Sequence, residues 1–361
     1  MDQQYGKMEN MVVYDGFFKG KKVFLTGHTG FKGSWMTLLL QALGAEVTGY
    51  ALSPDQEQNL FDYAGLDKKM CSHIGDIRNY SVLEDAMKNA DPDIVIHMAA
   101  QPLVIESYKN PVYTYETNVI GTVNLLETIR QSPNVAVCLN ITTDKVYQNN
   151  EWLWGYRETD ALGGHDPYSN SKACSELATQ SYRDSFFVDS DTIVATARAG
   201  NVIGGGDWAD NRLVPDFIRA IQSGEQVVIR SPKAVRPWQH VLDCLGGYLH
   251  LIWQLSAKKN LASSYNFGPE NDNIRSVESL IDKVCKAWGE SASYRIEDNG
   301  AFHEAGLLRL DISRARQELG WQPKWGMETT VSQIVAWYKA FSEGQDALEL
   351  CQNQIDEFLL H

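Results

Sequence analysis

The chain has 361 residues, of which 43% are hydrophobic, and its formal net charge is −14 at neutral pH. This length allows two domains, or one large α/β unit with an added lobe, and the composition is that of a globular protein with a sizeable core. The negative charge argues against non-specific binding to nucleic acids or anionic membranes. A local positive site for an anionic small molecule remains compatible with it.

The sequence gives no sign of a membrane or secretory segment. No apolar run approaches the roughly 20 residues needed to cross a bilayer, and residues 1–19 lack a signal-like apolar stretch, so we expect a short extension there. The six cysteines are scattered without a C-x-x-C pair, which predicts buried free thiols. We therefore expect a cytoplasmic protein.

The first half of the chain alternates between apolar runs and segments with helical spacing. Strands are predicted at 21–27, 45–53, 92–100, 134–143 and 191–204, and helices at 34–44, 81–91, 111–132 and 166–186. Ser81, with Glu84 three residues later, is the predicted N-cap of the second helix. Because the strands are continuously apolar, the predicted fold class is doubly wound α/β, with a parallel Rossmann-type sheet covered on both faces.

The pattern loosens after Gly204, where we predict loops, a helix and a hairpin. We predict a Rossmann domain at 20–204, to which part of 237–270 returns through a strand at 263–269. Segments 205–236 and 271–361 are predicted to form a smaller C-terminal α/β lobe that binds the substrate.

The stretch "TGHTGFKG" follows a predicted strand and opens a helix. Gly27 permits a tight turn, Gly30 lets the backbone approach a pyrophosphate, and Gly33 lets the helix pack on the strand. The helix N-terminus adds free N–H groups and a positive dipole. This context predicts a dinucleotide site.

The second predicted strand ends in "GYALSPDQEQ", which has Ser53 and Asp55 near the position of a ribose-binding acid and no Arg for a 2′-phosphate. NAD is therefore preferred over NADP. Asp76, in "GDI", is a further candidate for cofactor contact, with a turn residue between strand and helix as the equally weighted alternative.

"YSNSK" places Tyr168 and Lys172 four residues apart, on one face of a helix. A phenol has a pKa near 10, and a neighbouring ammonium and a positive nicotinamide would lower it. Such a pair can take a hydroxyl proton while hydride leaves the same carbon.

The glycine loop, "HMAA", "NVIGT", the threonine at the end of the fourth predicted strand and the Tyr-Lys pair occur in the order of the extended short-chain dehydrogenase/reductase family. The chain resembles this family from about residue 20 to residue 330. The resemblance implies that Thr143 binds the reacting hydroxyl of the substrate. It also implies that Asn118 lies on a helix beside the active site and contacts the substrate. It also implies cofactor contacts from Phe31, Ile77, Ala99 and Ala100, and from Tyr168 and Lys172.

The stretch "TTDKVY" resembles the sugar-nucleotide 4,6-dehydratases of this family, and Asp144-Lys145 resembles those acting on CDP-glucose. The resemblance implies oxidation at C4 with Tyr168 as base, loss of water across C5–C6 with Asp144 as acid, and return of hydride to C6. Lys145 is either the C5 base or an orienting group, with a surface lysine paired to Asp144 as the plain alternative. The product would be CDP-4-keto-6-deoxyglucose, for a bacterial surface polysaccharide such as a lipopolysaccharide O-antigen.

Cationic side chains are needed for the diphosphate of such a substrate, and Arg suits bidentate phosphate contact. The candidates are Arg198, Arg212 and Arg236, with a plain surface ion pair as the alternative for each. The resemblance implies that Arg212 and Arg236 face the diphosphate or ribose, with Asn201 nearby. The histidines form no metal-ligand pattern, so no metal is expected. The resemblance also implies a homodimer or homotetramer.

Two other functions fit the same fold. A sugar-nucleotide 4-epimerase needs only oxidation and reduction, and Asp144-Lys145 speaks against it. A non-catalytic NAD-binding protein would usually have lost Tyr168 or Lys172, and both residues are present.

Overall fold

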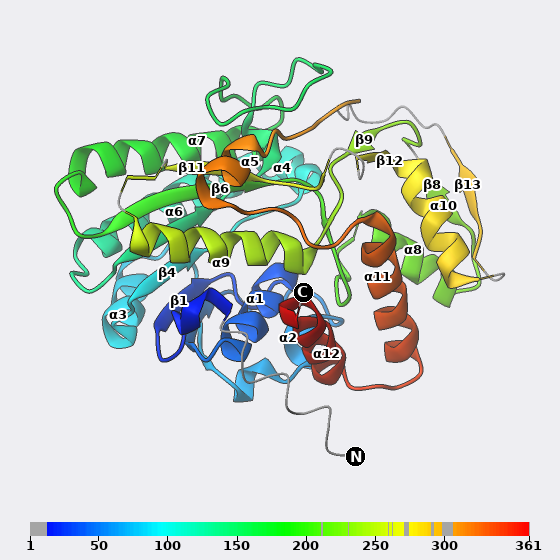
Figure 1. Ribbon diagram of the computed structural model, residues 1–361, viewed down its shortest axis with the longest axis horizontal. Coiled ribbons are helices and arrows are strands. Elements are labelled where there is room, and N and C mark those ends of the chain that lie inside the picture. Colours follow the sequence, from blue (N-terminus) through cyan, green and yellow to red (C-terminus); the bar gives the residue numbers. More distant parts are fainter. Residues whose placement is uncertain are drawn as a thin grey trace.

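The computed structural model describes residues 13–210, 212–229, 231–258, 260–261, 263–270, 274–289, 292–297 and 306–360 (Figure 1). The predicted N-terminal extension lies outside the described residues up to position 12. From there the chain packs on the domain, because Phe18 is buried and the Tyr14 hydroxyl donates to the Gly246 carbonyl at 3.1 Å.

The centre of the molecule is a parallel sheet of seven strands in the order β11-β6-β5-β4-β1-β2-β3. Its strands are β1 (Lys22–Thr26), β2 (Glu46–Ala51), β3 (Cys71–Ile74), β4 (Ile94–His97), β5 (Val137–Ile141), β6 (Ile193–Ala199) and β11 (Ser264–Phe267). The middle strands β4 and β5 are buried along their whole length, as their apolar sequences require.

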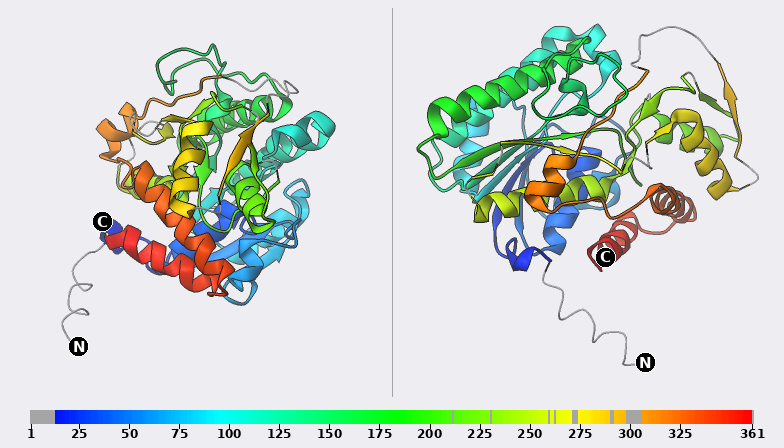
Figure 2. Two further views of the ribbon diagram at one scale, coloured as in Figure 1. Left: turned by 90° about the vertical axis from the view of Figure 1, so that its right-hand side faces the viewer. Right: turned by 45° about the horizontal axis from the view of Figure 1, so that its top comes forward.

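Helices cover both faces of this sheet (Figures 1 and 2). One face carries α3 (Tyr80–Ala90), α4 (Val104–Lys109), α5 (Pro111–Tyr115), α6 (Gly121–Arg130) and α7 (Pro167–Tyr182). The other carries α1 (Phe31–Ala42), α2 (Leu60–Tyr63), α9 (Val241–Ala257) and α12 (Ala347–Leu360). This arrangement confirms the predicted doubly wound α/β fold.

Three local predictions were wrong. The hairpin predicted after Gly204 does not form among the described residues, because the short strands there pair with strands elsewhere in the chain and not with one another. The edge strand β3 was missed, because it pairs on one side only and its residues Cys71–Ile74 are partly or fully exposed, so they need not be apolar. The N-cap of α3 is Asn79 and not Ser81, since the Asn79 side chain accepts a hydrogen bond from Val82 N.

The smaller lobe lies beyond the carboxyl edge of the sheet, on the right of Figure 1. It contains α8 (Leu213–Gln222), α10 (Val277–Trp288) and α11 (Met327–Ser342). Its strand pairs are β7 (Val202–Ile203) with β10 (Gln239–His240), β9 (Val235–Arg236) with β12 (Arg275–Ser276), and β8 (Val227–Ile229) with β13 (Tyr294–Ile296). The last helix, α12, packs back on α1 and α2.

The remaining helical segments are single turns: 3₁₀ turns at Val13–Gly16, Leu66–Lys68 and Asp144–Val146, and π-helical turns at Glu116–Ile120, Arg183–Phe187 and Ala315–Leu319. Among the described segments, no helix combines the length and the apolar composition needed to cross a membrane.

Candidate active site

The carboxyl ends of the central strands meet at one edge, where the strand order reverses between β1 and β4. In open parallel sheets ligands bind at this point. The predicted site residues follow these strand ends: Gly27 after β1, Ala99 and Ala100 after β4, Thr143 after β5, and Asn201 after β6.

The glycine loop between β1 and α1 fits a dinucleotide phosphate. Gly27 has φ +77°, and a Cβ atom there would lie 2.7 Å from Ala99 N. At Gly33 a Cβ atom would lie 2.0 Å from the Gly27 oxygen, which explains the close packing of helix on strand. Gly30 is the N-cap of α1, and no side chain caps this end of the helix. A Cβ atom built on Gly30 would have one neighbour within 4 Å, the Gly27 oxygen at 3.5 Å, so the space beside it is open. The loop therefore leaves room and backbone N–H groups for an anion.

The residues after β5 form a buried polar turn. Thr143 caps the 3₁₀ turn Asp144–Val146, since its Oγ1 accepts from Lys145 N at 3.3 Å and donates to Asp144 Oδ1 at 3.0 Å. Asp144 is only 2% exposed, and its Oδ2 has no hydrogen-bond partner within the part of the chain that the structure describes. Burial raises the pKa of Asp144, against the opposing charge of Lys145. A carboxyl group in this setting can hold a proton and donate it.

Helix α7 presents Tyr168 and Lys172 to the same turn. Its start is fixed by Asp166, whose side chain accepts from Ser169 N at 2.9 Å. Burial raises the pKa of Tyr168 to about 12, and a hydrogen bond with Thr143 opposes this shift. Burial and the charge of Lys32 lower the pKa of Lys172 to about 8. The structure thus brings together Thr143, Tyr168 and Asp144, as the sequence predicts.

Lys172 is anchored to the strand end itself. Its Nζ donates to the Ile141 carbonyl at 3.1 Å, and the side chain is 4% exposed. Lys145 follows Asp144 on the 3₁₀ turn and is partly exposed.

Two of the three predicted phosphate-binding arginines lie at this edge. Arg212 pairs with Asp207 at 2.9 Å and is close enough to Tyr168 to affect its pKa. Arg236 is 7% exposed and its charge lowers the pKa of Asp144. Asn201, at the end of β6, is half-buried, and its backbone carbonyl accepts from Gln239 N.

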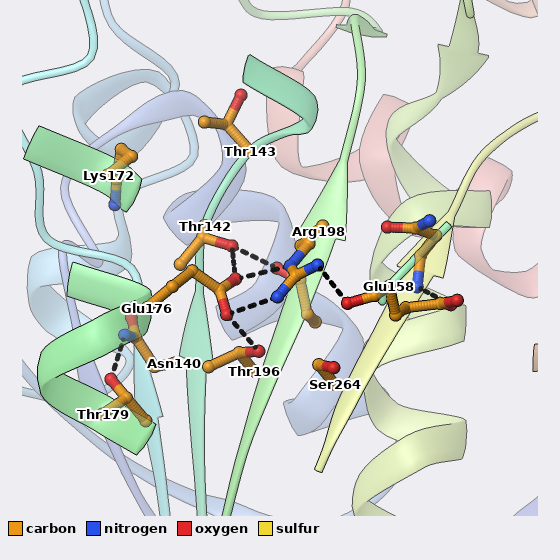
Figure 3. A network of polar contacts seen from close by, with 12 residues as sticks. Asn140, Thr142, Thr143, Glu158, Lys172, Glu176, Thr179, Thr196, Arg198 and Ser264 are labelled. Carbon is orange, nitrogen blue, oxygen red and sulfur yellow. Dashed lines mark hydrogen bonds and ion pairs between the residues drawn. The ribbon is translucent and has the colours of Figure 1, made fainter. Parts of the chain in front are cut away.

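The prediction for Arg198 was wrong. Arg198 is on β6, and its guanidinium forms a bidentate ion pair with Glu176 of α7, with both side chains 4% exposed (Figure 3). Since its donors are used inside the protein, Arg198 is not available to a diphosphate. Sequence alone does not reveal this, because the acid partner is on another element.

Asn118 also has an internal role. Its Oδ1 accepts from Gln101 N at 2.9 Å, and its Nδ2 donates to the Gln101 carbonyl and to Ser171 Oγ. The side chain is 1% exposed. Asn118 therefore ties the loop after β4 to helix α7 and does not reach the substrate side.

The cofactor candidates after β3 differ from each other. Arg78 donates to both carboxylate oxygens of Asp76, which lowers the Asp76 pKa, and a shallow open depression lined by Asp76 and 78–81 lies beside them. The Ile77 side chain is 4% exposed and packs against Gly121, where a Cβ atom would lie 2.6 Å from it. Only the backbone of Ile77 can therefore face a cofactor.

The histidines near the site are structural. His97 lies between the hydroxyls of Thr26, at 2.7 Å, and Thr122, at 3.1 Å, and burial lowers its pKa to about 3. His28 contacts Ser72 Oγ at 2.7 Å. Within the described ranges, no group of three potential metal-ligating side chains is found.

Sequence reasoning missed Glu176 and Thr142. The Thr142 hydroxyl donates to the Glu176 carboxylate at 2.5 Å, directly below Thr143 (Figure 3). The signal was present, because Glu176 continues the spacing of four residues from Tyr168 to Lys172 along the same helix face.

The chain matches the model of a family described as GDP-mannose 4,6 dehydratase over residues 24–334. It is 47% identical over 349 residues to the CDP-glucose 4,6-dehydratase of Salmonella typhimurium, covering 95% of this chain and 97% of that protein.

Solved structures share the fold. The dTDP-glucose 4,6-dehydratase of Streptomyces venezuelae, with NAD and TYD bound, superimposes with a TM-score of 0.76 at 24% identity, covering 90% of this chain and 99% of that one. The UDP-glucuronic acid 4-epimerase of Bacillus cereus also gives 0.76, at 21% identity, covering 88% and 99%. At this identity the likeness shows the fold, which dehydratases and epimerases have in common.

We predict that Lys172→Met increases stability at pH 7 by about 1–3 kcal/mol. The folded chain holds this ammonium at a lowered pKa of about 8, whereas the unfolded chain keeps its proton up to about 10.5. At 1.36 kcal/mol per pKa unit the burial penalty is about 3 kcal/mol, partly offset by the hydrogen bond to Ile141. Between these two pKa values the unfolded state binds more protons, so the wild type gains stability as pH rises.

Urea unfolding at pH 7 and at about pH 9.5 measures this difference. The advantage of Lys172→Met should be largest at pH 7 and shrink at the higher pH. Lys109→Met, at an exposed position, is the control and should show no such trend. A variant less stable than the wild type at pH 7 would contradict the prediction.

Proposed function

The chain belongs to the GDP-mannose 4,6 dehydratase family of extended short-chain dehydrogenases/reductases, and from this membership we propose that it dehydrates CDP-glucose to CDP-4-keto-6-deoxyglucose. The observation that carries the proposal is the buried carboxyl group of Asp144, whose Oδ2 is unpartnered among the described residues and which adjoins Thr143 and Tyr168. An epimerase would have no use for an acid at this position.

The cofactor is NAD, which when bound takes hydride from C4 of the sugar and returns it to C6. Its pyrophosphate fits the loop of Gly27, Gly30 and Gly33, with the first residue of α1, Phe31, offering its N–H group. We assign cofactor contacts to Ala99 and Ala100, which follow β4, and to Lys172, whose ammonium would also stabilise the phenolate of Tyr168.

The first chemical task of the chain is to take the proton of the 4-hydroxyl. In the protein alone Tyr168 is a poor base, because burial raises its pKa to about 12. The positive nicotinamide and the nearby ammonium of Lys172 both favour the phenolate, and the Thr143 hydroxyl orients the sugar oxygen. These three residues supply the oxidation half of the reaction.

The second task is to remove the 6-hydroxyl as water. The 4-keto group acidifies the C5 proton, and Asp144 donates a proton to the leaving hydroxyl. Its raised pKa keeps the carboxyl protonated more readily, which suits an acid. Lys145, on the next position of the same turn, is the proposed C5 base or orienting group.

The substrate diphosphate needs positive charge at the same edge. We assign Arg212 and Arg236 to it, with Asn201 beside them, since both arginines lie near catalytic groups. Arg198 has no part in this contact, because Glu176 engages it.

The proposal is tested by incubating the protein with CDP-glucose, and separately with UDP-glucose, and measuring product masses. We expect loss of one water from the CDP sugar, and turnover of the UDP sugar at least about ten times slower. An unchanged mass with inverted C4 would mean an epimerase, and no change with either sugar would mean a non-catalytic NAD-binding protein.

We predict that Asp144→Asn separates the two halves of the reaction. Oxidation at C4 should persist, seen as accumulating absorbance of the reduced cofactor, while water loss slows by about 100-fold or more because the general acid is missing. Stopped-flow absorbance and product mass measure the two steps. Asp243→Asn, which removes another buried carboxylate, is the matched control. Dehydration at the normal rate in Asp144→Asn would refute the acid assignment.

We also propose a homodimer through helices α5 and α7. An apolar patch on these helices and the adjoining π turn, the α5–α7 patch, consists of Val112, Tyr115, Ile120 and Leu177, which are between 36% and 70% exposed. The two helices pack side by side at the top of Figure 1. Such patches mark interfaces, and a self-complementary contact around a two-fold axis would bury it.

Ile120→Lys combined with Leu177→Lys should lower the association constant of this dimer by about 30- to 1,000-fold. Across the two-fold axis each new lysine would face either the same lysine of the partner subunit or an apolar surface. Sedimentation equilibrium measures the association. Ile296→Lys, at a similarly exposed position on β13, is the control and should leave it unchanged. A wild-type protein that sediments as a monomer would overturn the proposal.

The cysteines support a cytoplasmic location, which we propose on their basis. All six are free thiols, and Cys138, Cys244 and Cys351 are buried. Unpaired cysteines are the norm in reducing compartments.

A further inference from the structure

Glu176 lies one helical turn beyond Lys172 on α7, and its carboxylate is enclosed by donors (Figure 3). Oε1 accepts from Thr142 Oγ1 at 2.5 Å and from Arg198 Nε at 2.9 Å. Oε2 accepts from Arg198 Nη2 at 2.9 Å and from Thr196 Oγ1 at 2.8 Å. One carboxylate therefore binds the end of β5 and two positions of β6 to helix α7.

Arg198 extends the network toward the edge strand β11, whose Asn266 is its register partner. Its Nη1 donates to Tyr147 Oη at 2.8 Å and to the Glu158 carbonyl at 3.2 Å. The Tyr147 hydroxyl donates to Asn266 Oδ1 at 2.7 Å, on β11. The guanidinium thus joins β6 to the segment after β5 and to the edge strand.

The network holds the backbone from which the catalytic turn begins. Lys172 fixes Ile141 and Glu176 fixes Thr142, which are consecutive residues immediately before Thr143. Thr142 points toward Glu176, whereas the Thr143 hydroxyl points away from the network (Figure 3). The position of Thr143 relative to Tyr168 therefore follows from contacts made one and two turns further along α7.

Stability alone does not account for such a pair. A buried ion pair loses the hydration of both ions, and replacement by apolar residues of similar volume is often neutral or stabilising. Apolar residues cannot reproduce the directional contacts of this pair: the two parallel hydrogen bonds from Arg198 to Glu176 and the hydrogen bond from the Thr142 hydroxyl.

We propose that Glu176 and Arg198 are positioning residues that set the catalytic turn at Thr143 and Asp144 against Tyr168. The inference deepens the proposed function, on which it rests for the roles of those three residues. Placement within a fraction of an ångström is what efficient proton transfer requires, and an error of about 1 Å can cost 100-fold in rate.

The pair also sets the charge around Lys172. The groups that face this ammonium are Glu176 on its own helix, Lys32 on α1 and the neutral His97 on β4. Arg198 neutralises Glu176, so removing one partner leaves an unbalanced charge one turn from Lys172. Loss of Arg198 should hold the proton on Lys172 to higher pH, and loss of the Glu176 charge should do the reverse.

The test compares Glu176→Gln, Arg198→Met and the double variant Glu176→Met with Arg198→Met, in the full-length holoenzyme with CDP-glucose. In the double variant we expect kcat to fall about 10- to 100-fold, with KM changed less than about threefold and the melting temperature close to wild type. The falling limb of the pH profile, where Lys172 loses its proton, should move to higher pH in Arg198→Met and to lower pH in Glu176→Gln.

Hydrogen exchange gives a readout that does not depend on activity. Segments 137–147 and 165–176 should exchange faster in the double variant. Asp243→Asn, whose carboxylate accepts from Lys324 N and Trp325 N far along the chain, is the control for general loss of a buried acid and should leave both segments unchanged.

A double variant with kcat within about twofold of wild type, or with unchanged exchange in both segments, would overturn the inference. Equal pH profiles in the two single variants would do the same, because a merely structural pair predicts no opposite shifts. If the wild type does not dehydrate CDP-glucose, the proposed function fails, while hydrogen exchange still decides whether the pair positions the turn. Glu176→Gln keeps the shape of the side chain, so the same measurements on this variant decide the question if the other variants do not fold.

Discussion

The docking of helix α7 on the carboxyl end of β5 is the contact on which the catalytic edge depends. Tyr168, Lys172 and Glu176 form one stripe along the helix, and two of them bind consecutive positions of the strand end. Because the next residues of the chain are Thr143 and Asp144, the helix and the strand bring the proposed base, acid and orienting hydroxyl together with no contribution from the small lobe. The role that we propose for the lobe and its arginines is to hold the substrate.

Burial at this edge shifts the pKa of each candidate titratable group in the direction that favours its neutral form. It raises the pKa of Tyr168 and Asp144 and lowers that of Lys172, so each group is biased toward its neutral form in the protein alone. For Asp144 this bias suits the proposed role of an acid. For Tyr168 it opposes the proposed role of a base, and a positive cofactor ring would act against it. On this proposal the phenol would be activated only with the cofactor in place.

The sequence predicted the doubly wound sheet, the glycine loop and the Tyr168–Lys172 pair, because each is encoded locally by hydrophobic pattern or spacing. Thr143 and Asp144 were added by the resemblance to the family. It failed where a side chain's partner is distant in sequence. Arg198 and Asn118 are polar residues near the expected edge, and only the structure reveals that Glu176 and the Gln101 backbone engage them. The edge strand β3 was missed for a different reason, since pairing on one side leaves it without an apolar signature.

The fold by itself cannot choose between dehydration and epimerisation, since structures of both kinds superimpose on this chain equally well. Oxidation and reduction need only a hydroxyl, a phenol and the cofactor, all of which the shared scaffold provides. Elimination of water needs in addition an acid at C6, and we assign this role to the carboxyl group in the turn after β5. A carboxylate there, shielded from water and with one oxygen unpartnered among the described residues, is costly unless a ligand uses it. The unpartnered oxygen of Asp144 therefore favours dehydration over epimerisation, because only dehydration needs an acid at this position.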